Sequence, residues 1–186
     1  MDRKIPTSQN SYSNIGWGKS LEEIILSLDV PNYDFVECGT WTGSSAKILA
    51  KKCKGIVHLF DSWEGVSDIG EFDNPIYKEL NWKAELDTCK VALSEYNNVS
   101  FYKGWIPSKF NEISKKQISL LHLDLSLYQP TKDSLDFFWD KIVDGGYAIT
   151  NFHEGYSYGA EKAVRDFFKG TREIEIEGFG ICIIKK

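Results

Sequence analysis

The sequence predicts an α/β fold in which a mostly parallel, seven-stranded sheet carries helices on both faces. Helical and strand patterns alternate from residue 20 to the end of the chain, which is typical of such sheets. Near the start, an apolar segment, Tyr33–Cys38, leads through a glycine turn into a helical pattern. The last segment, Glu173–Ile184, alternates around the Gly178–Gly180 turn, so we expect an antiparallel hairpin at one edge of the sheet.

Helices are predicted at five places, where apolar residues recur at helical spacing. The first helix begins at a capping box, Ser20-Leu-Glu-Glu23, and ends before Pro31. The fourth helix begins at Thr131, which we expect to cap it, and ends at Gly145-Gly146. The apolar faces, in chain order, contain Leu21, Ile24, Ile25 and Leu28; Ala46, Leu49, Ala50 and Cys53; Trp82, Leu86, Cys89 and Leu93; Leu135, Phe138, Trp139 and Ile142; and Ala160, Ala163, Val164 and Phe167.

Five strands are predicted before the C-terminal hairpin. They are Tyr33–Cys38, Ile56–Phe60, Val99–Tyr102, Ile118–Asp124 and Tyr147–Thr150. Residues 61–78 contain Gly65, Gly70, Pro75 and several acidic residues without any periodicity. Loops of this length in a compact domain usually have a function, so we expect residues 61–78 to form one wall of a binding site.

Length and charge limit the class of protein. At 186 residues the chain has the size of one domain, with residues 1–31 as an N-terminal lid or helix segment and residues 33–186 as the ligand-binding core. The formal charge is −5, and basic residues cluster only in the short pairs Lys51-Lys52 and Lys115-Lys116. Nucleic acid is therefore not an expected partner, because its phosphates attract basic surfaces.

The cysteines and the apolar segments indicate where the protein works. The four cysteines are widely spaced, form no C-x-x-C motif and lie in apolar surroundings, so they are predicted to be buried thiols in a reducing compartment. The N-terminus lacks the apolar stretch of a signal peptide, and no apolar run approaches the roughly 20 residues that span a bilayer. We therefore expect a cytoplasmic protein without a membrane partner.

Polar residues stand where the predicted strands end. The segment Glu37-Cys-Gly39-Thr-Trp-Thr-Gly43 follows the first strand. Its glycines let the backbone pass close to a ligand, and the next helix offers free N–H groups at its N-terminus. The spacing is G-x-x-x-G rather than the G-x-G-x-x-G of dinucleotide sites, and Glu37 would repel a pyrophosphate. An acid at this place suits a ligand that carries an amino group and a sulfonium.

A second acid follows the second strand. Asp61 lies 22 positions after Gly39. At about this spacing, roughly 20 residues, an acidic side chain accepts hydrogen bonds from ribose hydroxyls in nucleotide-binding folds. The glycine turn and the downstream acid together indicate a nucleoside ligand.

Four segments together resemble the macrocin and mycinamicin sugar O-methyltransferases, over roughly residues 33–168. They are Phe35-Val-Glu-Cys-Gly-Thr-Trp-Thr-Gly-Ser-Ser45, Leu59-Phe-Asp-Ser-Trp-Glu-Gly65, Lys103-Gly-Trp105 and His122-Leu-Asp-Leu-Ser-Leu-Tyr-Gln-Pro-Thr131. The resemblance implies a Rossmann-like class I methyltransferase fold with S-adenosylmethionine as the methyl donor. In the best-known members it also implies methylation of a sugar hydroxyl with help from a divalent cation.

The resemblance assigns roles to individual residues. It places Glu37, Gly39 and Gly43 around the methionine part of the donor, Asp61 and Ser62 at the ribose, Gly104 and Trp105 at the adenine, and Asp124 beside the transferred methyl group. Thr40, in the same turn, is also predicted to bind the donor.

Two features depart from the family pattern. Only about 32 residues precede the first strand, where relatives often have a longer extension over the acceptor, so we expect a more open acceptor pocket or one that a neighbour completes. Where the family has two successive aspartates after the fifth strand, this chain has Asn151-Phe152, and Ser126 replaces the second acid of the Asp-x-Asp segment. Magnesium prefers carboxylate ligands, so we expect at most a weak metal site made by Asp124 and Asn151.

The three histidines are predicted to differ in role. His58 and His122 lie inside predicted strands and are expected to be core or near-core groups. His153 follows the fifth strand, next to the expected point of methyl transfer, and an unperturbed pKa of ~6.5 suits a general base. His153 and Asp124 are therefore the predicted catalytic residues.

The sequence thus predicts an S-adenosylmethionine-dependent O-methyltransferase that acts on a hydroxyl of a small molecule, such as a sugar or glycoside. One alternative is a methyltransferase for a phenolic or amine acceptor. Another is a non-catalytic module that binds an adenosyl ligand, which the Asn151-Phe152 departure leaves open. An NAD-dependent reductase conflicts with the glycine spacing and with Glu37.

Overall fold

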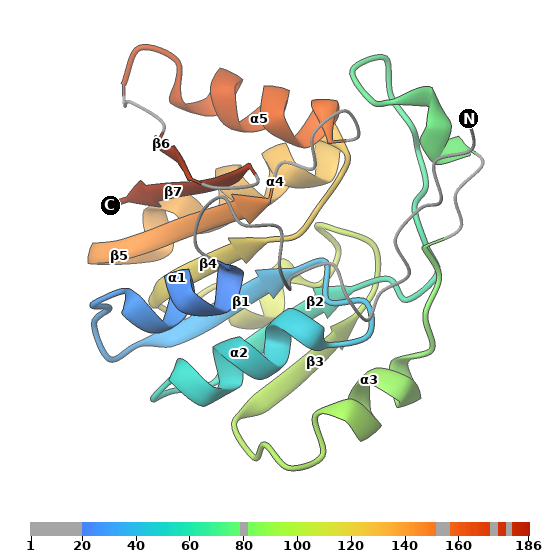
Figure 1. The fold of residues 1–186 in the computed structure, drawn as a ribbon. Helices are drawn as coiled ribbons and strands as arrows, with labels where there is room; N and C mark the ends of the chain where they lie inside the picture. Colours follow the sequence, from blue (N-terminus) through green and yellow to red (C-terminus); the bar gives the residue numbers. More distant parts are fainter. Residues whose placement is uncertain (1–19, 79–81, 152–156, 172–174, 178–179) are drawn as a thin grey trace.

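A computed structural model describes residues 20–78, 82–151, 157–171, 175–177 and 180–186. In these ranges one sheet has the strand order β3-β2-β1-β4-β5-β7-β6, with β3 at one edge and the β6–β7 hairpin at the other (Figure 1). The strands are β1 (Asp34–Cys38), β2 (Val57–Asp61), β3 (Val99–Lys103), β4 (Ile118–Leu123), β5 (Ile142–Asn151), β6 (Glu175–Glu177) and β7 (Ile181–Lys185). Strands β1 to β5 pair in parallel, and β7 pairs antiparallel with both β5 and β6. The predicted fold class is confirmed.

Helices cover both faces of the sheet. On one face, α1 (Leu21–Ser27), α2 (Ser44–Lys52) and α3 (Leu86–Ala92) enclose one apolar cluster, and on the other α4 (Tyr128–Phe138) and α5 (Tyr158–Phe168) enclose a second (Figure 1). Three short 3-10 helices complete the described elements: η1 (Pro75–Lys78), η2 (Phe110–Ile113) and η3 (Trp139–Lys141). In the described part of the chain, every helix is too short or too polar to cross a membrane.

Several local predictions are confirmed. The Ser20 hydroxyl accepts the Glu23 backbone N–H at 3.2 Å, and the Glu23 carboxylate accepts the Ser20 backbone N–H at 2.7 Å, so the capping box forms. The predicted apolar face of α2 is buried. All four cysteines are free and buried, and burial raises the pKa of the Cys89 thiol to about 12. These thiols are therefore structural rather than nucleophilic groups.

The predicted starts of two helices were wrong. The third helix begins at Leu86, so Trp82 precedes it rather than lying on its face. The fourth helix begins at Tyr128, and Thr131 is a buried residue inside it whose hydroxyl donates to the Leu127 carbonyl at 2.7 Å. The cap comes from elsewhere in the chain, because Asp73 Oδ1 accepts the Tyr128 backbone N–H at 2.7 Å.

The predicted start of strand β5, at Tyr147, was also wrong, because the strand begins at Ile142. Gly145-Gly146 lies inside this strand instead of ending the preceding helix. The pairing of β4 with β5 shifts register at this point, and Gly145 has a left-handed φ of +81°. A Cβ added at Gly146 would lie 2.8 Å from the Ser119 carbonyl oxygen, so the glycine allows the bulged strand to approach β4.

A polar network joins Asp34 and His58, near the amino ends of β1 and β2, to Tyr102 of β3. His58, which is 3% exposed, lies with Nε2 3.1 Å from Asp34 Oδ2 and Nδ1 2.9 Å from the Tyr102 hydroxyl. Lys116 adds an ion pair to Asp34 at 3.2 Å. The prediction that His58 and His122 are core groups is confirmed, since His122 is fully buried.

We expect the free energy of unfolding to decrease as the pH falls below 6.5, because burial lowers the pKa of His58 below its ordinary value of 6.5. The unfolded chain then binds the proton before the folded one, so this contribution to stability is complete above pH 6.5 and declines below it. Urea unfolding between pH 8 and pH 5 measures the decline. The His58→Gln variant should show a shallower decline, and equal slopes for both proteins would contradict the assignment.

Candidate functional site

The carboxyl ends of four parallel strands bring the predicted site segments together. The Gly39 N–H donates to the Phe60 carbonyl at 2.9 Å, which joins the ends of β1 and β2. The Asp124 N–H donates to the Cys38 carbonyl at 2.9 Å, and the Gly104 N–H donates to the Asp61 carbonyl at 3.0 Å. Ligands of open α/β sheets bind at this edge, where the strand order reverses beside the first strand.

The turn after β1 depends on its two glycines. Gly39 has a φ of +88°, and a Cβ added there would lie 2.2 Å from the Asp124 carbonyl oxygen. Gly43 has a φ of +89°, and its added Cβ would lie 3.1 Å from Cys89 Sγ. Gly43 also precedes α2 without any side-chain cap. The turn therefore runs close to β4 and leaves the first N–H groups of α2 uncapped.

The side chain of Asp61 also has a structural role, which the sequence did not indicate. Its Oδ2 accepts the Trp41 backbone N–H at 2.8 Å, and its Oδ1 accepts the Trp63 backbone N–H at 2.6 Å. The Trp63 indole N–H donates to the Trp41 carbonyl at 2.8 Å. Both tryptophans are in the left-handed region, with φ of +47° at Trp41 and +54° at Trp63. Strained non-glycine residues of this kind cluster at ligand sites. The two left-handed tryptophans are therefore a further indication of a ligand site, and only the structure reveals it.

Ser62 directly follows Asp61, and Trp105 follows Gly104, whose N–H donates to the Asp61 carbonyl. The Ser62 hydroxyl donates to the Gly65 carbonyl at 3.2 Å and accepts the Glu64 N–H at 3.1 Å, so it closes a turn after β2. Trp105 follows Gly104 at the end of β3 and is 42% exposed. The predicted ribose and adenine residues are therefore neighbours along the edge formed by β2 and β3.

Glu37 and His122 form a buried pair beneath the glycine turn. They are register partners on β1 and β4, both are fully buried, and Glu37 Oε1 lies 2.9 Å from His122 Nδ1. Glu37 Oε2 is closed to solvent and has no hydrogen-bond partner among the described residues. The Thr40 hydroxyl is likewise buried without a partner in that part of the chain. Buried polar atoms of this kind require an explanation, and a bound ligand is one.

The predicted catalytic side is described only in part. Asp124 is half-buried directly after β4, across from Gly39. The backbone of Asn151 pairs with Ile181 at the end of β5. His153 and Phe152 lie outside the described residues.

At the positions of the family's acidic cluster, the described residues Asp124, Ser126 and Asn151 provide one carboxylate. Ser126 stands where the family pattern has an acid, and Asn151 stands where it has another. Within the described ranges, no three His, Cys, Asp or Glu side chains are grouped so that they could hold a metal ion together. A site built from several carboxylates, as magnesium prefers, is therefore not formed by these residues.

The loop of residues 61–78 is fastened to the N-terminal ends of α4 and α5. Asp73 is 7% exposed, and its Oδ2 accepts the Gly70 N–H at 2.8 Å while Oδ1 caps α4 at Tyr128. A Cβ at Gly159, in the first turn of α5, would lie 1.9 Å from Asp73 Oδ1. The rings of Phe72 and Tyr128 also pack, with centroids 4.8 Å apart. The loop thus contacts the first turns of both α4 and α5.

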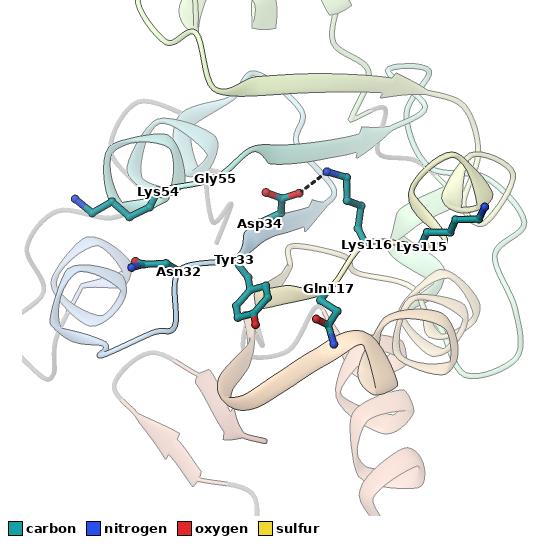
Figure 2. Close-up of a pocket in the computed structure, with 8 residues that line it drawn as sticks. All are labelled: Asn32, Tyr33, Asp34, Lys54, Gly55, Lys115, Lys116 and Gln117. Atoms are coloured by element: carbon teal, nitrogen blue, oxygen red, sulfur yellow. Dashed lines mark ion pairs between the residues drawn. The ribbon is translucent and has the colours of Figure 1, made fainter.

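A pocket of about 500 Å³ lies at the amino ends of the parallel strands, opposite the candidate site (Figure 2). Its lining residues precede or begin β1, β2 and β4: Asn32, Tyr33, Asp34, Lys54, Gly55, Lys115, Lys116 and Gln117. Figure 2 shows Lys116 reaching toward Asp34, whereas Lys54 and Lys115 extend away from it. Ligand sites of parallel sheets lie at the carboxyl ends of the strands, so the pocket is not the candidate site.

The strand order and the helices on both faces are those of the class I methyltransferase fold. The family model described as macrocin-O-methyltransferase (TylF) matches residues 18–178. The chain belongs to this family of O-methyltransferases, and the predicted resemblance is confirmed.

Individual relatives agree with the family match. The chain is 25% identical over 182 residues to 8-demethyl-8-(2,3-dimethoxy-alpha-L-rhamnosyl)-tetracenomycin-C 4'-O-methyltransferase of Streptomyces olivaceus, covering 86% of this chain and 68% of the relative. It is 24% identical over 165 residues to demethyldecarbamoylnovobiocin O-methyltransferase of Streptomyces niveus, covering 76% of this chain and 62% of the relative. The structure of the O-methyltransferase NovP shares the fold, with a TM-score of 0.71 and 20% identity over 89% of this chain and 78% of NovP.

We expect Gly39→Ala to destabilise the protein by about 2–5 kcal/mol, from left-handed backbone strain and overlap with the β4 backbone. Gly170→Ala is the matched control. Gly170 has a φ of +73° but no atom within 4 Å of an added Cβ, so its substitution should cost only the strain, about 1–2 kcal/mol. Denaturant unfolding of both variants measures the difference, and equal losses would show that the close approach to Asp124 is unimportant.

Proposed function

We propose that this methyltransferase transfers the methyl group of S-adenosylmethionine to a hydroxyl of a small glycoside. One observation carries the proposal: in a chain of this family, the strained glycine turn, the buried Glu37 and Asp61 meet at the carboxyl ends of β1 and β2. The donor supplies an electrophilic methyl group on a sulfonium. The protein residues bind it, orient it and exclude water.

The residues of this edge fit the donor. Glu37 Oε2, which has no partner among the described residues, suits the donor's ammonium group. The uncapped N-terminus of α2, with Thr40 and Gly43 before it, suits the donor's carboxylate. Each oxygen of Asp61 accepts one backbone N–H and retains a further lone pair, so the carboxylate can also accept ribose hydroxyls.

The adenine and ribose positions complete the proposed donor site. The exposed Trp105 ring offers an aromatic surface beside Gly104, and Ser62 lies next to Asp61. Asp124 is assigned to the position beside the methyl group, because its backbone touches the glycine turn.

A sugar hydroxyl is the proposed acceptor. The name of the Streptomyces olivaceus relative contains a rhamnosyl group and a 4'-O-methyl transfer. The loop of residues 61–78 and the first turn of α4, which the Phe72–Tyr128 ring contact joins, form the proposed acceptor wall next to Asp124. The acceptor proton is proposed to pass to His153 or Asp124, because the residues available do not suit a tight magnesium site.

We expect S-adenosylmethionine and S-adenosylhomocysteine to raise the melting temperature, and NAD to leave it unchanged, because a ligand of the native state alone stabilises that state.

Asp61→Ala should weaken donor binding about tenfold or more, since it removes charge-assisted hydrogen bonds. It should also lower the melting temperature, because two backbone N–H groups lose their acceptor.

The ribose contact is separated from this structural loss by a ligand control. Calorimetry compares S-adenosylhomocysteine with its 2'-deoxy analogue for both proteins. The wild type should discriminate against the analogue, and Asp61→Ala should not. Undiminished discrimination in the variant would remove Asp61 from the ribose site.

We expect methyl transfer to persist in excess chelator and to fall at least about tenfold in His153→Ala, because the loss of a general base typically costs 10²–10⁴-fold. An aryl rhamnoside serves as the acceptor in this assay. Activity that is abolished by chelator and restored by magnesium would refute the metal-free proposal, whatever the variant does. Full turnover in His153→Ala with reduced stability would assign His153 a structural role instead.

A further inference from the structure

Glu37 and His122 are polar residues on an otherwise apolar face of the sheet. Side chains alternate along a strand, so Glu37 shares the face of Phe35, and His122 shares that of Leu120. Their neighbours on the next strands in register are Leu59 and Ile149, both fully buried in the same apolar cluster. Apolar side chains therefore flank the pair on both sides, and Glu37 stands two residues before Gly39.

Burying such a polar pair costs free energy, and the packing of the core does not require polar residues at these two positions. Apolar residues of similar size at these two positions would usually be neutral or stabilising, because the desolvation of charged groups opposes their attraction. The cost is increased here because Glu37 Oε2 has no partner within the described residues. A buried carboxylate that uses one oxygen and leaves the other without a partner is suited to bind a ligand group there.

We propose that His122 is a positioning residue for the methyl donor. By holding Oε1 of Glu37 at 2.9 Å through Nδ1, it fixes the plane of the carboxylate so that Oε2 is available to the donor's ammonium group. The inference rests on the proposed function and extends it from Glu37 to a residue on β4. Without His122 the carboxylate loses its one described side-chain partner and can rotate away from the ligand.

The test uses two ligands that differ in the amino acid part, which carries the ammonium group. S-adenosylhomocysteine carries the amino acid part of the donor, whereas 5'-methylthioadenosine keeps the adenosyl thioether and lacks it. Calorimetry gives the dissociation constants of both for the wild type and for His122→Leu, which has similar bulk and no donor. We expect the variant to bind S-adenosylhomocysteine about tenfold more weakly or worse, and to bind 5'-methylthioadenosine within about twofold of the wild type.

A double-mutant cycle identifies the residue through which His122 acts. Glu37→Gln should show the same ligand-selective loss, and the double variant should lose little more than either single variant, because the two side chains act as a unit. Additive losses would overturn the proposal.

The outcomes separate the inference from the proposed function. If the wild type binds neither ligand, the proposed function is wrong and the inference falls with it. If the wild type binds both and His122→Leu weakens both equally or neither, His122 is only structural and the inference alone is wrong. If His122→Leu does not fold, His122→Asn and His122→Gln decide. In His122→Asn the amide nitrogen takes the place of Nδ1, so this variant should bind S-adenosylhomocysteine as the wild type does. In His122→Gln the amide nitrogen takes the place of Nε2, so this variant should show the selective loss. Equal binding by the two variants would refute the proposal.

Discussion

The carboxylate of Asp61 is the contact on which the geometry of the candidate site depends. Its side chain holds the backbone N–H groups of Trp41 and Trp63, and its carbonyl holds that of Gly104, so the ends of β1, β2 and β3 meet at one residue. A left-handed conformation costs a non-glycine residue about 1–2 kcal/mol, whereas a hydrogen bond to a charged group contributes about 1.5–3 kcal/mol. Two such bonds therefore suffice to keep both tryptophans in their strained conformations.

The sheet adds a dry and rigid base below this turn. Its central strands, β1 and β4, are buried between two helical layers. Glu37 and His122 sit near the end of that base, where the strands give way to the turn. An acid in such a place interacts more strongly with a cation than it would in water, because the surrounding side chains exclude solvent. The same enclosure makes an unsatisfied oxygen costly, so the site is suited to a ligand with a matching positive group.

Much of this fold could be predicted from the sequence, because the signals for it are local. The capping box at Ser20, the apolar face of α2 and the glycine turn each depend on residues close together in the chain. The start of α4 could not be predicted, because its cap is Asp73, which lies 55 positions from Tyr128. The start of β5 was missed for a related reason. A glycine pair ends a helix or allows a strand to approach its neighbour, and only the distance from Gly146 to Ser119 decides between the two.

The same distinction explains why the donor half of the site was predicted in more detail than the acceptor half. The proposed donor residues follow strand ends, and parallel strands bring those ends to one edge without further information. The proposed acceptor side depends on the loop of residues 61–78, whose position is set by contacts with residues far along the chain. Asp73 joins that loop to the first turns of α4 and α5, where helix dipoles favour a negative charge. The segment from Asp124 to Tyr128 lies between the glycine turn and this contact. Asp73 therefore ties the position of this loop to the segment that carries Asp124 and Tyr128.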